Sequence, residues 1–400
     1  MRILHLLAQR PGLTGSGVYL QSIVRLADAE GHQQAVICGI PAGEVISFDA
    51  KYQPEQYAVF FETTELPFPV TGMSNVMPYK STRYNQLKGK MLQQWKTAFT
   101  QQITKAIEEF QPDIILSHHL WLLSALALQI TSDIPIYLIN HGTALRQTKF
   151  CPHLAAEIVP HLQRADLVYA LNETQRDKLI KEFQLDPEKI KITGNGYNEA
   201  VFYFEKRQPN KIKKLVYAGK IAYAKGIREL LFSLNSISAS EVKFELTLCG
   251  SGAGNELQEI KSLAEKCTFP ITFTGNLTQP ELADIFRASD IFILPSYYEG
   301  LPLVLIEALA CGLQVIVNDL AGLKEWLEKA ISNSKMIDFV TPPELNDVYE
   351  PLPAEIPAYC LRLKEAIHHS LKLKSQEYDL CNDIRNFSWI EVYNRIKQYW

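Results

Sequence analysis

Short apolar runs alternate with longer amphipathic runs along the chain. Runs of apolar and β-branched residues predict buried strands, and apolar residues that recur every three or four positions predict helices. The chain opens with a strand at 3–8, a helix at 18–27 and a strand at 34–39, a pattern that favours a parallel sheet. Further strands are predicted at 113–117, 134–140, 167–171, 214–218, 243–248, 271–274, 291–294 and 314–317, with helices near 120–130, 226–236, 255–266, 279–288 and 302–311.

The alternation is interrupted between residues 194 and 210. Gly194, Gly196 and Pro209 lie there in a polar stretch that is typical of a linker. The expected fold class is therefore α/β, with two Rossmann-like domains facing each other across a cleft. Ligands of such sheets bind beyond the carboxyl ends of the strands. The predicted parts are a first domain at 1–195, a linker at 196–210, a second domain at 211–375 and a final helix at 385–400.

Two segments depart from this rhythm. Residues 50–98 are rich in Tyr, Phe, Pro and Gln, and are predicted to form an excursion from the first domain. Residues 341–357 contain several prolines and are predicted to be an extended surface connection. Elsewhere Asn172 is expected to cap a helix, with Gln175 completing a capping box.

Composition narrows the class of protein. The 400 residues are 47% hydrophobic and 21% charged, with a net charge of -4, so disorder is excluded and no nucleic-acid partner is expected. The seven cysteines form no CxxC pair, which favours a reducing compartment over a disulfide scaffold or a zinc site. The longest apolar stretch, 120–130, is too short to span a bilayer, and the N-terminus lacks a signal-peptide pattern. We therefore expect a cytoplasmic protein.

The most informative motif is EGLPLVLIE at residues 299–307, which follows a predicted strand and turns into a predicted helix. Pro302 suits the first helical position, and the free N–H groups at 303–305 could receive a phosphate. The carboxylates of Glu299 and Glu307 are suited to sugar or ribose hydroxyls. A solvated turn residue is the alternative for Glu299, whereas Glu307 lies among apolar neighbours and would need a partner.

Two further loops could bind phosphate. Lys220 and Lys225 bracket the loop AGKIAYAKG and could hold a diphosphate, although exposed lysines are the simpler reading. The loop GLTGSG at 12–17 opens a helix and could offer backbone N–H groups. Neither this loop nor the Gly250-Ser251-Gly252 turn matches a dinucleotide fingerprint, and there is no P-loop. A nicotinamide enzyme or an NTPase is therefore disfavoured.

Strand-end histidines are the remaining candidates. His141 lies in NHGT at the end of one predicted strand, and His118 and His119 end another. Each could contact a substrate or be a structural residue. His118, His119 and Arg146 are the predicted acceptor contacts. The sequence has no D-x-D triplet and no H-x-x-x-H spacing, so no metal is expected.

These motifs together resemble the family 4 glycosyltransferases, retaining enzymes of GT-B fold, over nearly the whole chain. EGLPLVLIEALACG is similar to the family's E-x7-E signature, and AGKIAYAKG is similar to its donor-phosphate loop. NHGT resembles its HGT motif, TGNGY its interdomain hinge, and FSW its C-terminal helix that crosses back to the first domain. Three positions depart from the family: Lys220 is often Arg, Pro302 is commonly Gly, and Gly194 replaces the hinge proline.

The resemblance implies roles for individual residues. Glu307 would bind the ribose, Glu299 and His141 would face the donor sugar, and Lys220 and Lys225 would neutralise the leaving diphosphate. The residues implied to be catalytic are His141, Lys220, Lys225 and Glu299. The residues implied to bind the nucleotide sugar are Gly15, Ser16, Gly17, Gly219, Gly300, Leu301, Leu303, Val304 and Glu307.

The predicted function is metal-independent, retaining transfer of a sugar from a nucleotide diphosphate sugar, expected to be a UDP-sugar, to an acceptor. No cofactor is expected besides this co-substrate. A lipid carrier, a growing glycan, a small thiol or acid precursor, and a protein all remain open as acceptors. The basic and aromatic segment 71–96 could touch an anionic membrane. The alternatives are a sugar-nucleotide epimerase of the same fold and an inactive nucleotide-sugar-binding protein.

Overall fold

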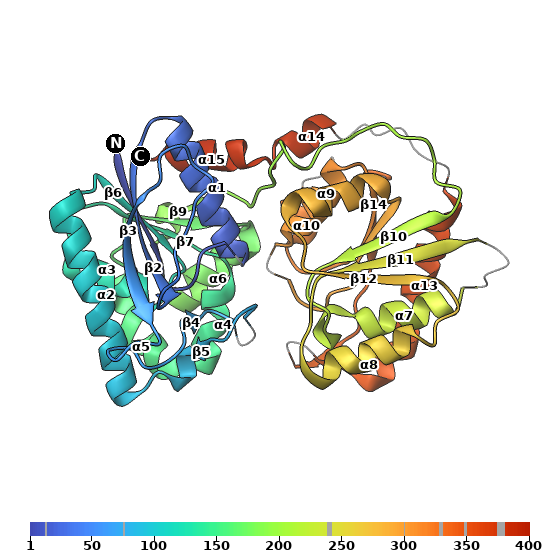
Figure 1. Cartoon of the computed structure of the whole chain (residues 1–400), viewed down its shortest axis with the longest axis horizontal. Helices are drawn as coiled ribbons and strands as arrows, with labels where there is room; N and C mark the ends of the chain where they lie inside the picture. The colour runs from blue at the N-terminus through green and yellow to red at the C-terminus, as the bar shows by residue number, and fades with distance from the viewer. Residues whose placement is uncertain are drawn as a thin grey trace. The chain divides into compact units, whose positions relative to one another are not determined.

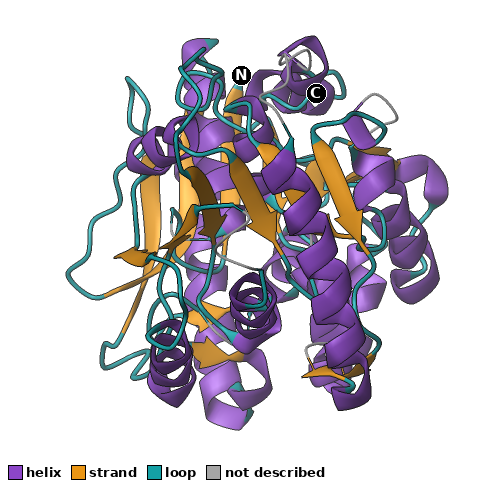
Figure 2. Ribbon diagram, turned by 90° about the vertical axis from the view of Figure 1, so that its right-hand side faces the viewer, coloured by secondary structure: helices purple, strands orange, loops and turns teal. Residues whose placement is uncertain are grey.

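The computed structural model describes residues 1–12, 14–74, 77–237, 242–299, 301–327, 331–347, 350–373 and 381–400. The chain divides into two compact units, which we call the first unit (Met1–Asn195 with Trp389–Trp400) and the second unit (Gly196–Ser388). Each unit is built on a parallel sheet whose strands are covered by helices (Figure 1 and Figure 2). The predicted α/β class with two parallel sheets is thus confirmed.

The first unit contains a seven-stranded sheet in the order β3-β2-β1-β6-β7-β8-β9, with every neighbouring pair parallel. Its strands are β1 (Arg2–Leu7), β2 (Gln33–Pro41), β3 (Glu55–Phe61), β6 (Ile114–His118), β7 (Ile136–Ile139), β8 (Leu167–Ala170) and β9 (Ile190–Ile192). Its helices are α1 (Gly15–Ala29), α2 (Gly89–Phe110), α3 (Leu122–Ile130), α4 (Thr143–Phe150), α5 (Pro152–Leu162), α6 (Glu173–Phe183) and α15 (Trp389–Lys397). Shorter elements are β4 (Thr71–Gly72), β5 (Thr82–Arg83), η1 (Tyr84–Gln86) and η2 (Pro187–Lys189).

The second unit contains a six-stranded parallel sheet in the order β12-β11-β10-β13-β14-β15. Its strands are β10 (Lys213–Ala218), β11 (Phe244–Cys249), β12 (Ile271–Gly275), β13 (Ile291–Leu294), β14 (Gln314–Asn318) and β15 (Ile337–Val340). Its helices are α7 (Ile227–Asn235), α8 (Gly254–Ala264), α9 (Gln279–Ala288), α10 (Leu303–Ala310), α11 (Leu323–Trp326), α13 (Ile356–Lys372) and α14 (Cys381–Arg385). Shorter elements are η3 (Tyr223–Lys225), η4 (Pro353–Glu355) and the antiparallel pair β16 (Leu345–Asp347) and β17 (Glu350–Pro351).

The two strand orders share one property that locates the sites. The order reverses between β1 and β6 in the first unit, and between β10 and β13 in the second. At such a switch point the connections on either side leave in opposite directions, which opens a crevice beyond the carboxyl ends of the strands. Functional residues are therefore expected in the loops that follow these four strands.

The C-terminal helix α15 belongs to the first unit, where it lies beside α1 (Figure 1). Arg395 Nε donates to the Thr193 carbonyl at 2.9 Å, and the Tyr393 hydroxyl donates to Glu30 at 3.1 Å. At the start of the helix the Trp389 ring packs edge-on against Tyr19 of α1, with 4.9 Å between centroids. The helix thereby closes one side of the first unit's core.

Three predictions differ from the structure: those for residues 50–98, for residues 341–357 and for the first residue of the helix after Pro302. Residues 50–98 are not a simple excursion, because they contain β3, the edge strand of the main sheet, and the first turns of α2. Residues 341–357 contain a strand pair, and α13 begins inside them at Ile356. Pro302 has an extended ψ of 105° and caps α10, which begins at Leu303 instead of at the proline.

Candidate functional site

In the second unit, the loop after β10 is fixed by its backbone. The buried Tyr217 hydroxyl donates to the carbonyl of Lys220 at 2.7 Å. The Gly219 and Ile221 N–H groups donate to the carbonyls of Cys249 and Ser251, each at 2.9 Å. The exposed Lys220 side chain therefore projects from a rigid loop.

Three glycines permit this close packing. A Cβ on Gly250 would lie 1.9 Å from the Gly219 carbonyl oxygen, and one on Gly252 would lie 2.3 Å from that of Ile221. Gly226, with φ of +67°, passes so close to Pro295 that its Cβ would lie 2.2 Å from the carbonyl oxygen. The glycines of the Gly250-Ser251-Gly252 turn are thus explained by backbone contact with the loop that carries Lys220.

Lys225 and Glu299 meet at the switch point of the second sheet. Lys225 Nζ lies 2.6 Å from Glu299 Oε1, and their side chains are 22% and 20% exposed. The ammonium also donates to the Tyr298 carbonyl at 3.4 Å. The Tyr297 N–H donates to the Ala224 carbonyl at 3.2 Å, which joins the loops after β10 and β13. The structure therefore brings together two residues that lie 74 positions apart in the sequence.

The N-terminus of α10 adjoins this ion pair in the sequence. Leu303 and Val304 occupy its first turn, where backbone N–H groups have no acceptor within the helix. The positive end of the helix dipole lies at this N-terminus and favours an anion. Leu301 is 8% exposed, and Gly300 lies outside the described residues.

Glu307 is the most unusual group of α10. It is only 6% exposed, and burial raises its pKa to about 8. Within the described part of the chain, its carboxyl group has no hydrogen-bond or ion-pair partner. A buried carboxyl without a protein partner is costly unless a ligand supplies donors to it.

A buried asparagine that was not predicted from the sequence holds the loop that precedes Glu299. Asn318, at the end of β14, donates through Nδ2 to the carbonyls of Pro295 and Ser296 at 2.9 and 3.1 Å. The Tyr359 hydroxyl of α13 donates to Asn318 Oδ1 at 2.9 Å. These bonds fix the chain that leads from β13 to Glu299. The only signal in the sequence is a polar residue directly after the apolar run 315–317.

In the first unit, the loop between β1 and α1 is organised by another missed residue. The buried Gln9 donates through Nε2 to the hydroxyls of Thr14 and Ser16, each at 2.9 Å. Thr14 Oγ1 caps α1 by accepting from the Gly17 N–H at 3.2 Å. A Cβ on Gly17 would lie 2.4 Å from the Gly12 nitrogen, whereas Gly15 is exposed. The Ser16 hydroxyl and the Gly17 N–H are thus both already engaged within the loop.

The three predicted histidines gather at the switch point of the first sheet. His118 Nδ1 lies 3.2 Å from His141 Nε2, and the two rings are parallel within 4°. His119 meets His141 edge-on at 4.8 Å between centroids, as does Tyr19 at 5.0 Å. We call His118, His119, His141 and Tyr19 the histidine cluster.

Burial keeps the histidine cluster uncharged. It lowers the pKa of His119 to about 3, and it lowers the pKa values of His118 and His141 well below the ordinary value. The neighbouring histidines add to both of the latter shifts. Near neutral pH these rings act through hydrogen bonds and not through positive charge.

The predicted acceptor contacts differ in accessibility. His118 and His119 are 1% and 4% exposed, and the Nε2 atom of each is buried without a hydrogen-bond partner in the described chain. This burial argues against direct contact with an acceptor and in favour of a supporting role behind His141. Arg146 lies in α4, where it donates to the Ser74 hydroxyl at 3.4 Å and its Cζ lies 5.9 Å from the Phe150 ring centroid.

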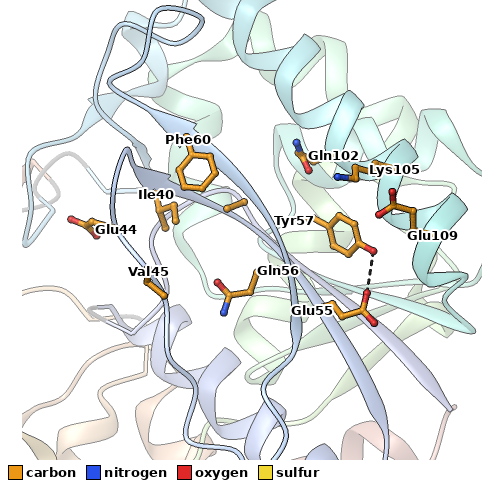
Figure 3. A pocket seen from close by; sticks show the side chains of 11 residues that line it. Ile40, Glu44, Val45, Glu55, Gln56, Tyr57, Phe60, Gln102, Lys105 and Glu109 are labelled. Carbon is orange, nitrogen blue, oxygen red and sulfur yellow. Dashed lines mark hydrogen bonds between the residues drawn. The ribbon is translucent and has the colours of Figure 1, made fainter.

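A separate groove runs along the free edge of β3 (Figure 3), with a volume of about 550 Å³. Its walls carry Glu55, Tyr57, Lys105 and Glu109, and the Tyr57 hydroxyl donates to Glu55 at 3.2 Å. None of the predicted site residues lines this groove. Across the described ranges, no group of three His, Cys, Asp or Glu side chains is arranged to hold a metal ion. In the same ranges, every helix is too short or too polar to cross a bilayer.

Comparison with known proteins agrees with this geometry. A family model described as Glycosyltransferase Family 4 matches residues 13–201, and one described as Glycosyl transferases group 1 matches residues 201–344. Glycogen synthase of Mycobacterium tuberculosis is 25% identical over 225 residues, which are 54% of each chain. D-inositol 3-phosphate glycosyltransferase of Segniliparus rotundus is 24% identical over 284 residues, covering 64% of this chain and 62% of the relative. The chain thus spans little more than half the length of these relatives.

The solved structures show the same architecture. HepE of Anabaena, determined with UDP and glucose, matches with a TM-score of 0.68 at 15% identity, over 99% of this chain and 98% of that chain. The fold is GT-B, the fold of these solved glycosyltransferases. Two consecutive family models, a GT-B fold and the E-x7-E and lysine-loop residues point the same way: the chain belongs to the group 1 glycosyltransferases, in glycosyltransferase family 4.

Proposed function

We propose that the chain is a glycosyltransferase that moves a sugar from a nucleotide diphosphate sugar, a UDP-sugar, to an acceptor. One observation carries this proposal: the Lys225–Glu299 pair lies at the switch point of the second sheet, in the same motif as the partnerless Glu307 carboxyl. HepE was determined with UDP and glucose, and a trehalose-6-phosphate protein of E. coli with UDP-2-fluoro glucose, which supports UDP as the nucleotide.

In the proposed mechanism the second unit binds the donor. Cleavage of the bond between the sugar and the diphosphate puts negative charge on the β-phosphate. Lys220, Lys225 and the first turn of α10 would stabilise that charge, since a pair about 4 Å apart contributes roughly 4 kcal/mol at an effective dielectric near 20. Glu299, held by Lys225, would accept hydrogen bonds from the sugar hydroxyls.

The first unit would bind the acceptor and complete the reacting face. His141 would contact the donor sugar through a neutral ring nitrogen, in keeping with its lowered pKa. The N–H groups of Gly15 and Ser16 at the start of α1 would face the phosphates, whereas the Gly17 N–H is taken by the Thr14 cap. We further propose retention of the anomeric configuration, with the leaving phosphate taking the acceptor's proton. No carboxylate pair acting as nucleophile and acid is needed, unlike in glycosidases.

A screen of nucleotide sugars tests the proposal. The full chain is incubated with UDP- and GDP-sugars, with and without candidate lipid, glycan, small-molecule and protein acceptors, and release of nucleotide and the products are followed. Acceptor-dependent release of UDP supports the proposal. A new nucleotide sugar formed without any acceptor would identify an epimerase instead. Tight UDP binding with no turnover across the screen would identify an inactive binding protein.

Tyr217→Phe is expected to lower kcat/KM for the nucleotide sugar about fivefold to tenfold. The variant keeps the buried ring and removes only the 2.7 Å bond to the Lys220 carbonyl, and one such bond contributes about 1 kcal/mol. Steady-state kinetics measure the change in kcat/KM, and urea unfolding measures the change in the free energy of unfolding. Tyr169→Phe is the matched control, because this hydroxyl also donates to a carbonyl, that of Ile396 at 3.1 Å. Equal kinetic losses in both variants would show that only general stability was disturbed.

We also propose a peripheral contact between the first unit and an anionic membrane surface. Lys80, Arg83, Lys88 and Lys90 are exposed around the start of α2, although Lys80 also pairs with Glu62. Each cation near such a surface contributes about 1 kcal/mol. The double variant Lys88→Glu with Lys90→Glu should therefore bind vesicles containing phosphatidylserine at least about tenfold more weakly in co-sedimentation. The same reversals at the exposed Lys206 and Lys211 are the control, and equal losses would refute the proposed surface.

A further inference from the structure

We infer that His118 is a positioning residue that fixes the tautomer of His141, so that His141 offers an Nδ1–H donor to the nucleotide sugar. The inference rests on the proposed function for the identity of the ligand. The tautomer itself is a property of the first unit, and it can be measured without any activity.

The contact between the two rings is direct. His118 Nδ1 and His141 Nε2 are 3.2 Å apart, and the ring planes differ by only 4°. Both rings are neutral near pH 7, because burial and the neighbouring histidines lower their pKa values. A neutral imidazole has one N–H donor and one bare acceptor nitrogen, so one ring must donate to the other.

The remaining nitrogen of His118 decides the direction. His118 Nε2 is buried and has no hydrogen-bond partner in the described chain. A proton on that atom would leave a buried N–H without an acceptor, the less tolerated kind of unsatisfied group. The proton of His118 is therefore on Nδ1, which donates to His141 Nε2. The proton of His141 must then be on Nδ1.

The surroundings hold both rings in this arrangement. Tyr19 meets His141 and His118 edge-on, at 5.0 and 5.9 Å between centroids, and is itself packed against Trp389. His119 meets the His141 ring edge-on and is held in turn by a 3.1 Å bond between its Nδ1 and the Thr143 hydroxyl. His141 is half-buried, and among the described residues its Nδ1 has no partner. This atom is therefore the polar group of the ring that is left for a ligand.

The consequence for the reaction is that His141 presents one hydrogen-bond donor with a defined orientation. An Nδ1–H on His141 would donate to a hydroxyl oxygen of the sugar, whereas the other tautomer would present a bare nitrogen at the same place. Without His118, both tautomers become available, and only one of them makes the bond. Loss of His118 should therefore lower kcat/KM for the donor about twofold to fivefold, because only the fraction of His141 that carries the Nδ1–H tautomer makes the bond.

The direct test is the long-range proton–nitrogen NMR spectrum of the full chain labelled with ¹⁵N-histidine. We expect a pyrrole-type Nδ1 and a pyridine-type Nε2 for His141 in the unsubstituted protein. His118→Leu should convert this pattern to a mixture or to the opposite tautomer. His118→Asn places an amide donor near the position of Nδ1 and should restore both the spectrum and kcat/KM.

Controls separate the possible failures. His5→Leu changes another buried histidine whose ring centroid lies 6.3 Å from that of His118, and it should leave the His141 tautomer unchanged. An Nε2–H tautomer of His141 in the unsubstituted protein refutes the inference, even if His118→Leu fails to fold. An unchanged His141 spectrum in folded His118→Leu refutes it as well. Absence of sugar transfer by the unsubstituted protein refutes the proposed function alone.

Discussion

Lys225→Ala is expected to lower kcat for sugar transfer by about 100- to 1,000-fold, the usual effect of removing one group that stabilises developing negative charge. The ammonium lies 2.6 Å from Glu299 and is only partly exposed, so its charge is weakly screened. Its removal also leaves the Glu299 carboxylate without its cation, beside the position proposed for the diphosphate. The KM for the nucleotide sugar should change much less than kcat, because the charge on the leaving phosphate grows in the transition state.

Three further variants separate the possible causes of this loss of kcat. Lys225→Arg keeps the charge and should recover much of the rate. Glu299→Gln added to Lys225→Ala removes the uncompensated carboxylate and shows how much of the loss came from repulsion. Lys324→Ala breaks an ion pair of the same length with Asp319 in the same unit and should leave kinetics unaltered. Turnover of Lys225→Ala close to that of the unsubstituted protein would reject the role assigned to Lys225.

The second large effect concerns Glu307 and the proton that it binds. Burial holds its pKa at about 8 in the empty protein, so the carboxyl is mostly protonated at pH 7. Ribose hydroxyls would donate to the ionised form and lower the pKa. Binding of UDP at pH 7 should therefore release close to one proton from Glu307, and affinity should increase with pH up to about 8. Glu307→Ala should weaken UDP binding by about 10- to 100-fold, since hydrogen bonds to a charged group contribute about 1.5–3 kcal/mol.

Calorimetry measures this linkage. Titrations with UDP in buffers of different ionisation enthalpy give the number of protons released. The nucleotide can exchange protons too, so the difference between the unsubstituted protein and Glu307→Gln isolates the contribution of Glu307. Equal proton release in both proteins would remove Glu307 from the nucleotide site.

The same group affects stability in the empty protein. Its folded pKa of about 8 lies above its ordinary value of 4.5, so the folded state binds more protons than the unfolded state between these pH values. Stability must therefore fall as pH rises from 4.5 to 8, and the cost is complete above that range. In urea unfolding, Glu307→Gln should lack this part of the pH dependence.

The sequence predicted most of the buried strands, because strands covered on both faces appear as continuous apolar runs. It predicted only some of the helices between them, and α2, α4, α5, β9 and β15 were missed. It missed β3, an edge strand in which Glu55, Gln56 and Phe60 are exposed and only the alternate positions are buried. It also missed α13, whose first residue, Ile356, lies at the end of the proline-rich segment 341–357. In both cases the local composition resembled a loop, and contacts with distant elements determined the structure.

The candidate site could likewise be predicted only in part. Lys225, Glu299 and Glu307 belong to motifs that can be read locally. Tyr217, Asn318 and Gln9 could not be found, since each acts through one hydrogen bond to a backbone or a loop that only the folded chain brings near. His118 was predicted as an acceptor contact, with a structural role as the alternative, whereas the folded chain buries it with its Nδ1 3.2 Å from His141 Nε2.

The return of α15 to the first unit has a consequence for synthesis of the protein. Residues 1–195 leave the ribosome well before residues 389–400, which complete the same core through Trp389 and Tyr393. The core of the nascent first unit therefore stays incomplete, with Tyr19 not yet covered by Trp389, until the whole second unit has been translated. We expect a translation product that ends at residue 388 to be bound by chaperones, and sugar transfer to begin only after the ring of Trp389 has been added.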